Sequence, residues 1–395
     1  MIVAGIISEY NPLHLGHTWH MEKTRIALGG DCAIICVMSG NFVQRGDFAI
    51  FNKQARAKAA VQCGADLVVE LPSPYALSSA AGFADAGVCI LDSLGVCEHI
   101  SFGSESGDVK LLVEAADAIA SREADELIKE WLKKGVSYAA AQQKAAGAIL
   151  GAGSVVFESP NNLLGIEYLK AISARNSPLK PLTIKRTGGE HDSDMGLSAS
   201  AMRKILIGGD KPWQFMPETA ADVCKEEITA GRGPVSMELC ETAILSRLRA
   251  AQGFSELPGA TEGLEYRFLR YAKTEPTVEA ILEKTKTKRY TMSRLRRMLI
   301  CACLGITAAD AKEPPSYIKV LAMNRTGMKI LACARKKTRL PIIIKPASAQ
   351  SLSERGLELF NKEAAATDFY VLAYPDENNR HGGQEWRQTP WTKSD

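Results

Sequence analysis

The chain has 395 residues, of which 46% are hydrophobic and 24% charged, and a net charge of +3. This length predicts two domains, and the composition excludes a disordered, collagenous or low-complexity protein. The apolar runs are shorter than the ~18 residues that a membrane-spanning helix needs, and the first residues lack the basic flank of a signal peptide.

Short apolar segments alternate with helical patterns through the first part of the chain. Strands are predicted at 2–7, 32–38, 67–71 and 99–102, with helices between them at 15–28, 53–63 and 76–94. The strand candidates are continuously apolar, which is typical of parallel strands covered on both faces. The pattern therefore predicts an α/β fold, a Rossmann-like doubly wound parallel sheet.

A helical insertion is predicted over residues 108–158. The α/β pattern then resumes with a helix at 161–174, a strand at 181–185 and a short helix at 198–207. From about residue 211 it gives way to helical stretches (237–252, 291–304), one strand candidate at 340–344 and a loose polar tail from Pro375. We therefore expect a catalytic domain over 1–210 and a basic, mainly helical domain over 211–395.

Charge is distributed unevenly along the chain. Residues 1–234 contain 22 Lys and Arg against 27 Asp and Glu (−5), whereas residues 235–395 contain 26 against 18 (+8). Residues 284–297 contain seven basic residues and residues 314–353 eight, with no acidic residue in either stretch. Such stretches can neutralise phosphates and predict a nucleic acid partner; two merely solvated faces are the alternative. The candidates are Lys284, Lys286, Lys288, Arg289, Arg294 and Arg297, with Tyr290 and Tyr317 to stack on bases.

A histidine motif follows the first predicted strand. His14 and His17 lie three residues apart at a helix start, so they share a face where the helix dipole favours an anion. Gly16 lets a phosphate or a flat ring approach the backbone. At this place doubly wound folds bind nucleotides, so the motif predicts a nucleoside triphosphate site with imidazole donors at the α-phosphate. An ordinary polar helix start is the alternative.

A second anion pocket is predicted near residue 200. Ser198 is a candidate helix N-cap, Ser200 lies in the first turn and Arg203 follows one turn later. Hydroxyl groups and a guanidinium at a helix start suit the β- and γ-phosphates. Alone this is a common capping pattern, but together with the histidine motif it completes a triphosphate site.

These two motifs are similar to those of the nucleotidyltransferase superfamily. The segments 38–46, 64–72, 102–105, 159–170 and 184–187 extend the likeness, and together they resemble the bacterial tRNA(Met) cytidine acetate ligases over most of the chain. Leu13, Leu15, Phe48 and Met202 depart from the family's pattern, but none of these changes removes a polar group.

The resemblance implies an activity. Members of this family activate acetate with ATP to acetyl-adenylate and transfer the acetyl group to N4 of the wobble cytidine of elongator tRNA(Met). It implies ATP with Mg²⁺, acetate and tRNA as reactants, a cytoplasmic location without a membrane, and is compatible with a homodimer. The implied ATP contacts are Ile7, Ser8, Glu9, Tyr10, Asn11, Pro12, Leu13, His14, Leu15, Gly16, His17, Thr18, Trp19, His20, Gly103, Asn161, Asn162, Arg186 and Thr187.

Acetate is already anionic at neutral pH, so the first step needs positive charge rather than a base. Gln44, Arg45, Lys53 and Arg56 are candidates to bring the two anions together, and Arg45 is favoured because it lies in a loop after a strand. For Lys53 and Arg56 a solvated helix face is the alternative. Glu9 is a candidate base for the second step or a group that orients a histidine.

Two other functions remain open from sequence. A small-molecule adenylyltransferase would share both motifs but would not need the long basic region, and a non-catalytic RNA-binding protein would not need intact histidines. Labelled pyrophosphate exchange into ATP, with and without acetate, separates the three. The ten cysteines and six histidines lack the spacing of a zinc site, so we expect free buried thiols in a reducing compartment.

Overall fold

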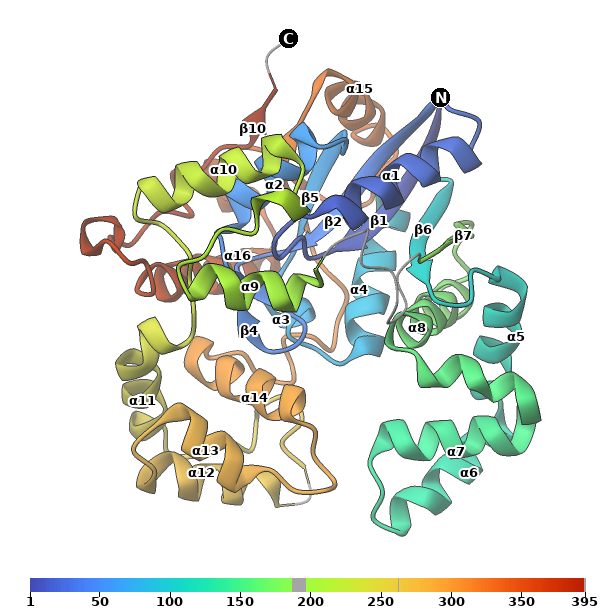
Figure 1. The fold of residues 1–395 in the computed structure, drawn as a ribbon, viewed down its shortest axis with the longest axis vertical. Helices are drawn as coiled ribbons and strands as arrows, with labels where there is room; N and C mark the ends of the chain where they lie inside the picture. The colour runs from blue at the N-terminus through green and yellow to red at the C-terminus, as the bar shows by residue number, and fades with distance from the viewer. Residues whose placement is uncertain (187–196, 262, 394–395) are drawn as a thin grey trace.

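The computed structural model describes residues 1–186, 197–261 and 263–393 (Figure 1). The main sheet has the strand order β10-β8-β5-β2-β1-β6-β7, and β9 pairs with β8. The strands are β1 (Ile2–Ser8), β2 (Cys32–Ser39), β5 (Leu67–Leu71), β6 (His99–Ser104), β7 (Lys180–Lys185), β8 (Ile318–Met323), β9 (Ile342–Ile343) and β10 (Trp391–Thr392). Only the β5–β8 pair is antiparallel among the described strands of this sheet. The predicted doubly wound α/β fold is confirmed.

Side chains of β2 show why its sequence is continuously apolar. Ala33, Ile35 and Val37 enter the core on one face of the sheet, and the residues between them enter the core on the other. Helices α3 (Ser73–Ala76), α4 (Ala80–Ser93) and α8 (Pro160–Ala174) contribute to the first core, and α1 (Leu15–Ala27), α2 (Lys53–Gln62), α9 (Ala199–Ile207) and α10 (Glu218–Thr229) to the second. Burial on both faces is what a doubly wound parallel sheet requires.

The predicted second domain over 211–395 is wrong in its extent. A separate core, which we call the helical module, is built mainly by α11 (Glu241–Ala250), α12 (Leu264–Thr274), α13 (Val278–Thr285) and α14 (Met292–Leu304). After it the chain returns to the catalytic sheet through β8, β9 and β10. Helix α15 (Arg325–Ala334) packs against the first core, and α16 (Glu354–Val371) contributes to both the first core and that of the helical module. The late strand candidate at 340–344 is confirmed as the short β9.

Strand β8 is not predicted from the sequence, because it contains a lysine and lies within a basic stretch. Lys319 is only 2% exposed, and its ammonium group binds the Glu385 carboxylate and lies 3.6 Å from Glu70 Oε2. Lys53 Nζ lies 2.6 Å from Glu70 Oε1 and 2.8 Å from Glu385 Oε1. These four residues form a buried ion cluster beneath the sheet edge, so Lys53 is neither an anion ligand nor part of a solvated helix face. Buried charges require such partners.

The predicted loose tail from Pro375 is also wrong. Glu385 is completely buried, and Thr367 Oγ1 of α16 donates to its Oε2 at 2.7 Å. The Trp386 ring packs edge-on against Phe360 with centroids 4.7 Å apart, and β10 pairs with β8. Ion pairing, an interaction that polar composition does not reveal, anchors this segment.

We expect the change Thr367→Val to lower the free energy of unfolding by about 1–3 kcal/mol, because it leaves a buried carboxylate oxygen without its donor. Urea unfolding followed by circular dichroism measures the difference. Ser351→Ala, at an exposed hydroxyl that donates to the Ser348 carbonyl, is the control and should change stability much less. Equal losses for both variants would contradict the importance of this bond.

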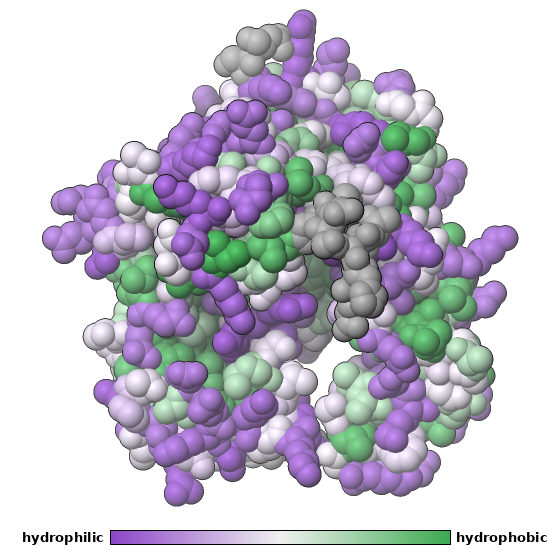
Figure 2. Space-filling model, in the orientation of Figure 1, coloured by the Kyte–Doolittle hydropathy of each residue, from purple (hydrophilic) through white to green (hydrophobic). Residues whose placement is uncertain are grey.

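Two helical lobes extend from the sheet on the same side of the molecule. The predicted insertion is present as α5 (Val109–Ile119), α6 (Arg122–Lys133) and α7 (Tyr138–Leu150). In Figure 1 both lobes lie below the sheet, with the helical module on the left and the insertion on the right. The space-filling view shows an open gap between the two lobes (Figure 2). Among the residues described, no helix is both long and apolar enough to cross a membrane.

Candidate active site

The histidine motif lies where β1 ends and α1 begins, as predicted. His14 is the N-cap of α1, and its Nδ1 accepts from Gly16 N at 3.1 Å. His17 Nδ1 accepts from His14 N at 3.2 Å, and the two ring centroids are 3.8 Å apart. Because both Nδ1 atoms accept, the neutral rings carry their protons on Nε2. The backbone thus sets two neighbouring imidazole donors side by side.

Burial keeps these imidazoles neutral. It lowers the pKa of His14 to about 4 and the pKa of His17 well below its usual value, and the nearby Arg186 adds to both effects. Burial and Arg186 also lower the pKa of His20 to about 4, and its Nε2 lies 3.0 Å from Ser101 Oγ. His20 is therefore engaged with β6, whereas the Nε2 atoms of His14 and His17 have no hydrogen-bond partner among the described residues and can act as neutral donors.

The lowered pKa of His14 predicts a loss of stability in acid. Between pH 6.5 and 5 the unfolded chain binds a proton at this imidazole and the folded chain does not, so stability falls as the pH falls. Relative to His14→Gln, the wild type should lose about 1–2 kcal/mol more over this range. Urea unfolding at each pH measures it, with His381→Gln at an exposed histidine as the control. Parallel profiles for wild type and His14→Gln would refute this account.

The late motif meets the histidine loop through Arg203. Ser198 is the N-cap of α9 and accepts from Ala201 N at 3.2 Å, as predicted. Arg203 Nη1 donates to the Asn11 carbonyl at 2.8 Å, a contact across 192 residues of sequence. The fold thereby brings together two motifs that the sequence separates. The predicted contact Thr187 lies outside the described residues.

The ends of β6 and β7 form another wall. Arg186 N donates to the Ser104 carbonyl at 2.8 Å, and a Cβ added to Gly103 would lie 3.2 Å from Arg186 Cγ. The charge of Arg186 also contributes to the lowered pKa of His14 and His17. Gly103 and Arg186 thus belong to the same cluster.

The predicted pair Asn161 and Asn162 binds protein groups. Asn162 Oδ1 accepts from Glu105 N at 3.0 Å and Ser106 N at 3.1 Å, and Asn161 Nδ2 donates to Glu105 Oε1 at 2.6 Å. Asn162 is 3% exposed. These two amides therefore shape the loop after β6.

A short hairpin, β3 (Phe42–Val43) and β4 (Asp47–Phe48), carries the anion candidates Gln44 and Arg45 at its turn. We call residues 44–46 the anion loop. Glu9 Oε1 accepts from Gln44 N at 2.7 Å, so the loop lies against the end of β1. Burial raises the pKa of Glu9, an effect that the Gln44 amide and nearby arginines oppose. Glu9 therefore orients this loop, and the structure gives it no hydrogen bond to a histidine among the described residues.

Arg56 is not on a solvated face, as one prediction had it, nor is it available to an external anion. Its side chain is 3% exposed and donates to the carbonyls of Glu9, Ser39, Gly40 and Phe51. It braces the ends of β1 and β2. An Ala-rich helix gives no polar alternation from which this burial could be recognised.

The basic candidates of the helical module differ in exposure. Lys284, Lys286 and Lys288 are exposed, and Lys284 pairs with Glu275 at 2.8 Å. Arg294 stacks over Tyr290 and donates to Gly259 and Thr261, and Arg297 Nη1 donates to the Gln44 carbonyl at 3.2 Å. The prediction that tyrosines stack on bases is wrong, because Tyr290 is 7% and Tyr317 1% exposed.

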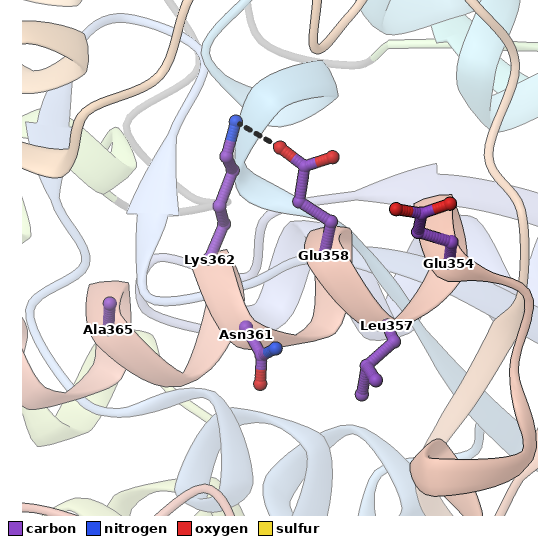
Figure 3. Close-up of a pocket in the computed structure, with 6 residues that line it drawn as sticks. All are labelled: Glu354, Leu357, Glu358, Asn361, Lys362 and Ala365. Carbon is purple, nitrogen blue, oxygen red and sulfur yellow. Dashed lines mark ion pairs between the residues drawn. The ribbon is translucent and has the colours of Figure 1, made fainter.

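A hollow elsewhere on the surface does not compete with this cluster. It runs along α16, and Figure 3 shows that its labelled residues come from that single helix. Its charged groups include the pair Lys362–Glu358 at 3.3 Å. We therefore assign the candidate site to the carboxyl ends of β1, β2, β6 and β7, where groups from several elements converge.

Comparison with known proteins gives a consistent result. A family model described as HIGH Nucleotidyl Transferase matches residues 1–385. A tRNA(Met) cytidine acetate ligase of Acetivibrio thermocellus is 38% identical over 98% of this chain and 99% of its own length. The enzyme of the same name from Thermosipho africanus is 37% identical, with 98% and 99% covered.

Solved structures agree. The crystal structure of Thermotoga maritima TmcAL bound with alpha-thio ATP superposes with a TM-score of 0.92 at 33% identity, covering 99% of each chain. The apo form of that protein gives a TM-score of 0.92 at 32% identity, again over 99% of each chain.

Proposed function

Since this chain belongs to the HIGH nucleotidyltransferases and, among them, to the tRNA(Met) cytidine acetate ligases, we propose that it acetylates N4 of the wobble cytidine of elongator tRNA(Met) with acetate and ATP. The observation that carries the proposal is the pair of neutral imidazoles, His14 and His17, whose Nδ1 atoms are both occupied by backbone donors. Their Nε2–H groups lie at the start of α1, where an α-phosphate is favoured.

In the first step an acetate oxygen attacks the α-phosphorus of ATP, and the bond from that phosphorus to the pyrophosphate oxygen breaks. The Nε2–H groups of His14 and His17 donate to the oxygens that gain charge in the transition state. Because both rings are neutral, they donate without being general acids. Arg186, Ser198, Ser200 and Arg203 bind the phosphates, and Mg²⁺ enters with ATP.

The anion loop holds acetate beside the nucleotide. Arg45 is exposed at its turn, next to Gln44, whose amide Glu9 fixes at 2.7 Å. One guanidinium near two anions offsets their repulsion and raises the effective concentration of acetate at the phosphorus. The carboxylate of acetate needs no deprotonation at neutral pH.

In the second step the cytidine N4 attacks the acetyl carbonyl, AMP leaves and N4 loses a proton. The RNA is bound by the helical module, on which Lys286 and Lys288 are exposed, and it enters the gap between the two lobes (Figure 2). Lysines of this kind bind the phosphate backbone independently of sequence. A tRNA substrate places the protein in the cytoplasm; that it forms a homodimer stays a prediction, which analytical ultracentrifugation checks.

The test is direct. Elongator tRNA(Met) transcript is incubated with the protein, ATP, Mg²⁺ and ¹³C-acetate, and its nucleosides are analysed by mass spectrometry. We expect labelled N4-acetylcytidine only in the complete mixture. Acetate-dependent pyrophosphate exchange without acetylcytidine would show that acetate is activated but that the cytidine of this tRNA is not the acceptor. Exchange that depends on another co-substrate would indicate a small-molecule adenylyltransferase.

A further inference from the structure

The anion loop is held from both sides. The Gln44 N–H donates to Glu9 Oε1 at 2.7 Å, and the Gln44 carbonyl accepts from Arg297 Nη1 at 3.2 Å. Glu9 directly follows β1 of the catalytic sheet, whereas Arg297 belongs to α14 of the helical module. One residue of the loop therefore joins the two parts of the molecule.

The backbone makes this contact close. Gly46 has a φ of +76°, and a Cβ added to it would lie 2.7 Å from the carbonyl carbon of Arg296. The turn thus packs directly on the α14 backbone, without side chains between them. Asp47 also faces Arg296, with 3.7 Å between Oδ2 and Nη1.

The surroundings of Arg297 favour a structural contact over one with RNA. Burial lowers the pKa of its guanidinium, which is largely removed from water and directed at the catalytic domain. A charge-assisted hydrogen bond shielded in this way is stronger than a surface contact.

We propose that Arg297 is a positioning residue for acetate: by holding the Gln44 carbonyl, it fixes Gln44 and Arg45 at the distance from the histidine motif that adenylation requires. The inference rests on the proposed function. It makes the helical module part of the adenylation site even when no RNA is bound.

The position of the contact predicts a selective effect. The loops that hold ATP are fixed by their own bonds, such as Arg203 to the Asn11 carbonyl and Arg186 N to the Ser104 carbonyl. Of the two hydrogen bonds that hold Gln44, the anion loop without Arg297 keeps only the one to Glu9. Binding of acetate should therefore weaken while binding of ATP does not.

The experiment measures acetate-dependent ATP–pyrophosphate exchange without RNA, in the full-length protein. Acetate is varied at saturating ATP, and ATP at saturating acetate. For Arg297→Gln we expect the KM for acetate to rise about tenfold or more, the usual effect of losing a charged hydrogen bond, with the KM for ATP unchanged within about twofold. Arg297→Lys keeps a charged donor and should restore part of the loss.

Arg249→Gln is the matched control. Arg249 also donates to a backbone carbonyl, that of Glu275 at 3.0 Å, but within the module. This variant should leave both KM values as in the wild type. If it raised the KM for acetate as much as Arg297→Gln does, the effect would be a general loss of module structure and the proposal would fail.

Other outcomes also decide the question. An unchanged acetate KM in folded Arg297→Gln, or equal rises for acetate and ATP, overturns the positioning role. If that variant does not fold, Arg297→Lys must still show a selective rise, and wild-type values for it would overturn the proposal. A wild type without acetate-dependent exchange refutes the proposed function itself, before any variant is compared.

Discussion

Replacing His17 with alanine is expected to lower acetyl-adenylate formation by more than ~100-fold, because it removes a donor to the charge that develops on the α-phosphate. The donor is well defined: His17 Nδ1 accepts from His14 N, so its proton is on Nε2. Burial lowers the pKa of His17 well below its usual value and keeps the ring neutral, so the exchange rate should show no titration at the ordinary imidazole pKa. Acetate-dependent pyrophosphate exchange measures the rate.

The variant also loses the bond from His14 N to the His17 ring. That cap is worth about 0.5–2 kcal/mol, so melting of wild type and variant must be compared and activity measured well below the lower transition. His381→Ala, at an exposed histidine of the C-terminal segment, is the matched control. Near-normal exchange by folded His17→Ala would refute the role of this imidazole.

The second prediction concerns RNA. Replacing Lys286, Lys288, Arg289 and Arg294 with glutamine should weaken tRNA binding by orders of magnitude while acetate-dependent exchange persists. Each lost phosphate contact should reduce the slope of log affinity against log salt by roughly 0.7–0.9. Weaker binding and lower salt dependence should thus appear together in filter-binding titrations.

A matched quadruple variant at Arg335, Lys336, Lys337 and Arg339, the cluster after α15, removes the same charge from the second basic stretch. Unchanged affinity and slope in the first variant would show that residues 286–294 form a solvated face, and losses confined to the second would move the RNA surface there. Loss of exchange in the first variant would mean that these side chains, like Arg297, support the adenylation site.

The strands of the sheet were predictable from sequence where burial alone determines that their residues are apolar. The runs at 2–7, 32–38 and 67–71 are apolar because both faces are covered, and their order follows from the helices between them. The burial of Lys319 and Glu385 could not be predicted in this way, because a charged residue that is paired in the core looks the same in the sequence as one exposed to water. Pairing over such separations is visible only in three dimensions.

The site was predictable where function follows from local backbone geometry. His14, His17 and Ser198 are placed by helix starts, which sequence reveals well. The position of Arg56 could not be predicted, because its side chain donates to carbonyls at the ends of β1 and β2. A helix sequence does not indicate which side chains will meet such carbonyls. Arg297 was assigned to RNA on the basis of a charge run alone.

The return of the chain to its first sheet has a consequence for biosynthesis. Strands β1, β2 and β5 leave the ribosome early, with Lys53 and Glu70 already in place, but Lys319 and Glu385 follow about 250 and 315 residues after Glu70. Until then β5 has an open edge and the ion cluster is incomplete, so the catalytic domain reaches its native state only near the end of translation. Long-range closure of this kind slows folding and exposes unpaired strands to aggregation. Nascent chains stalled before residue 385 should therefore depend on chaperones, although the whole histidine motif has been made.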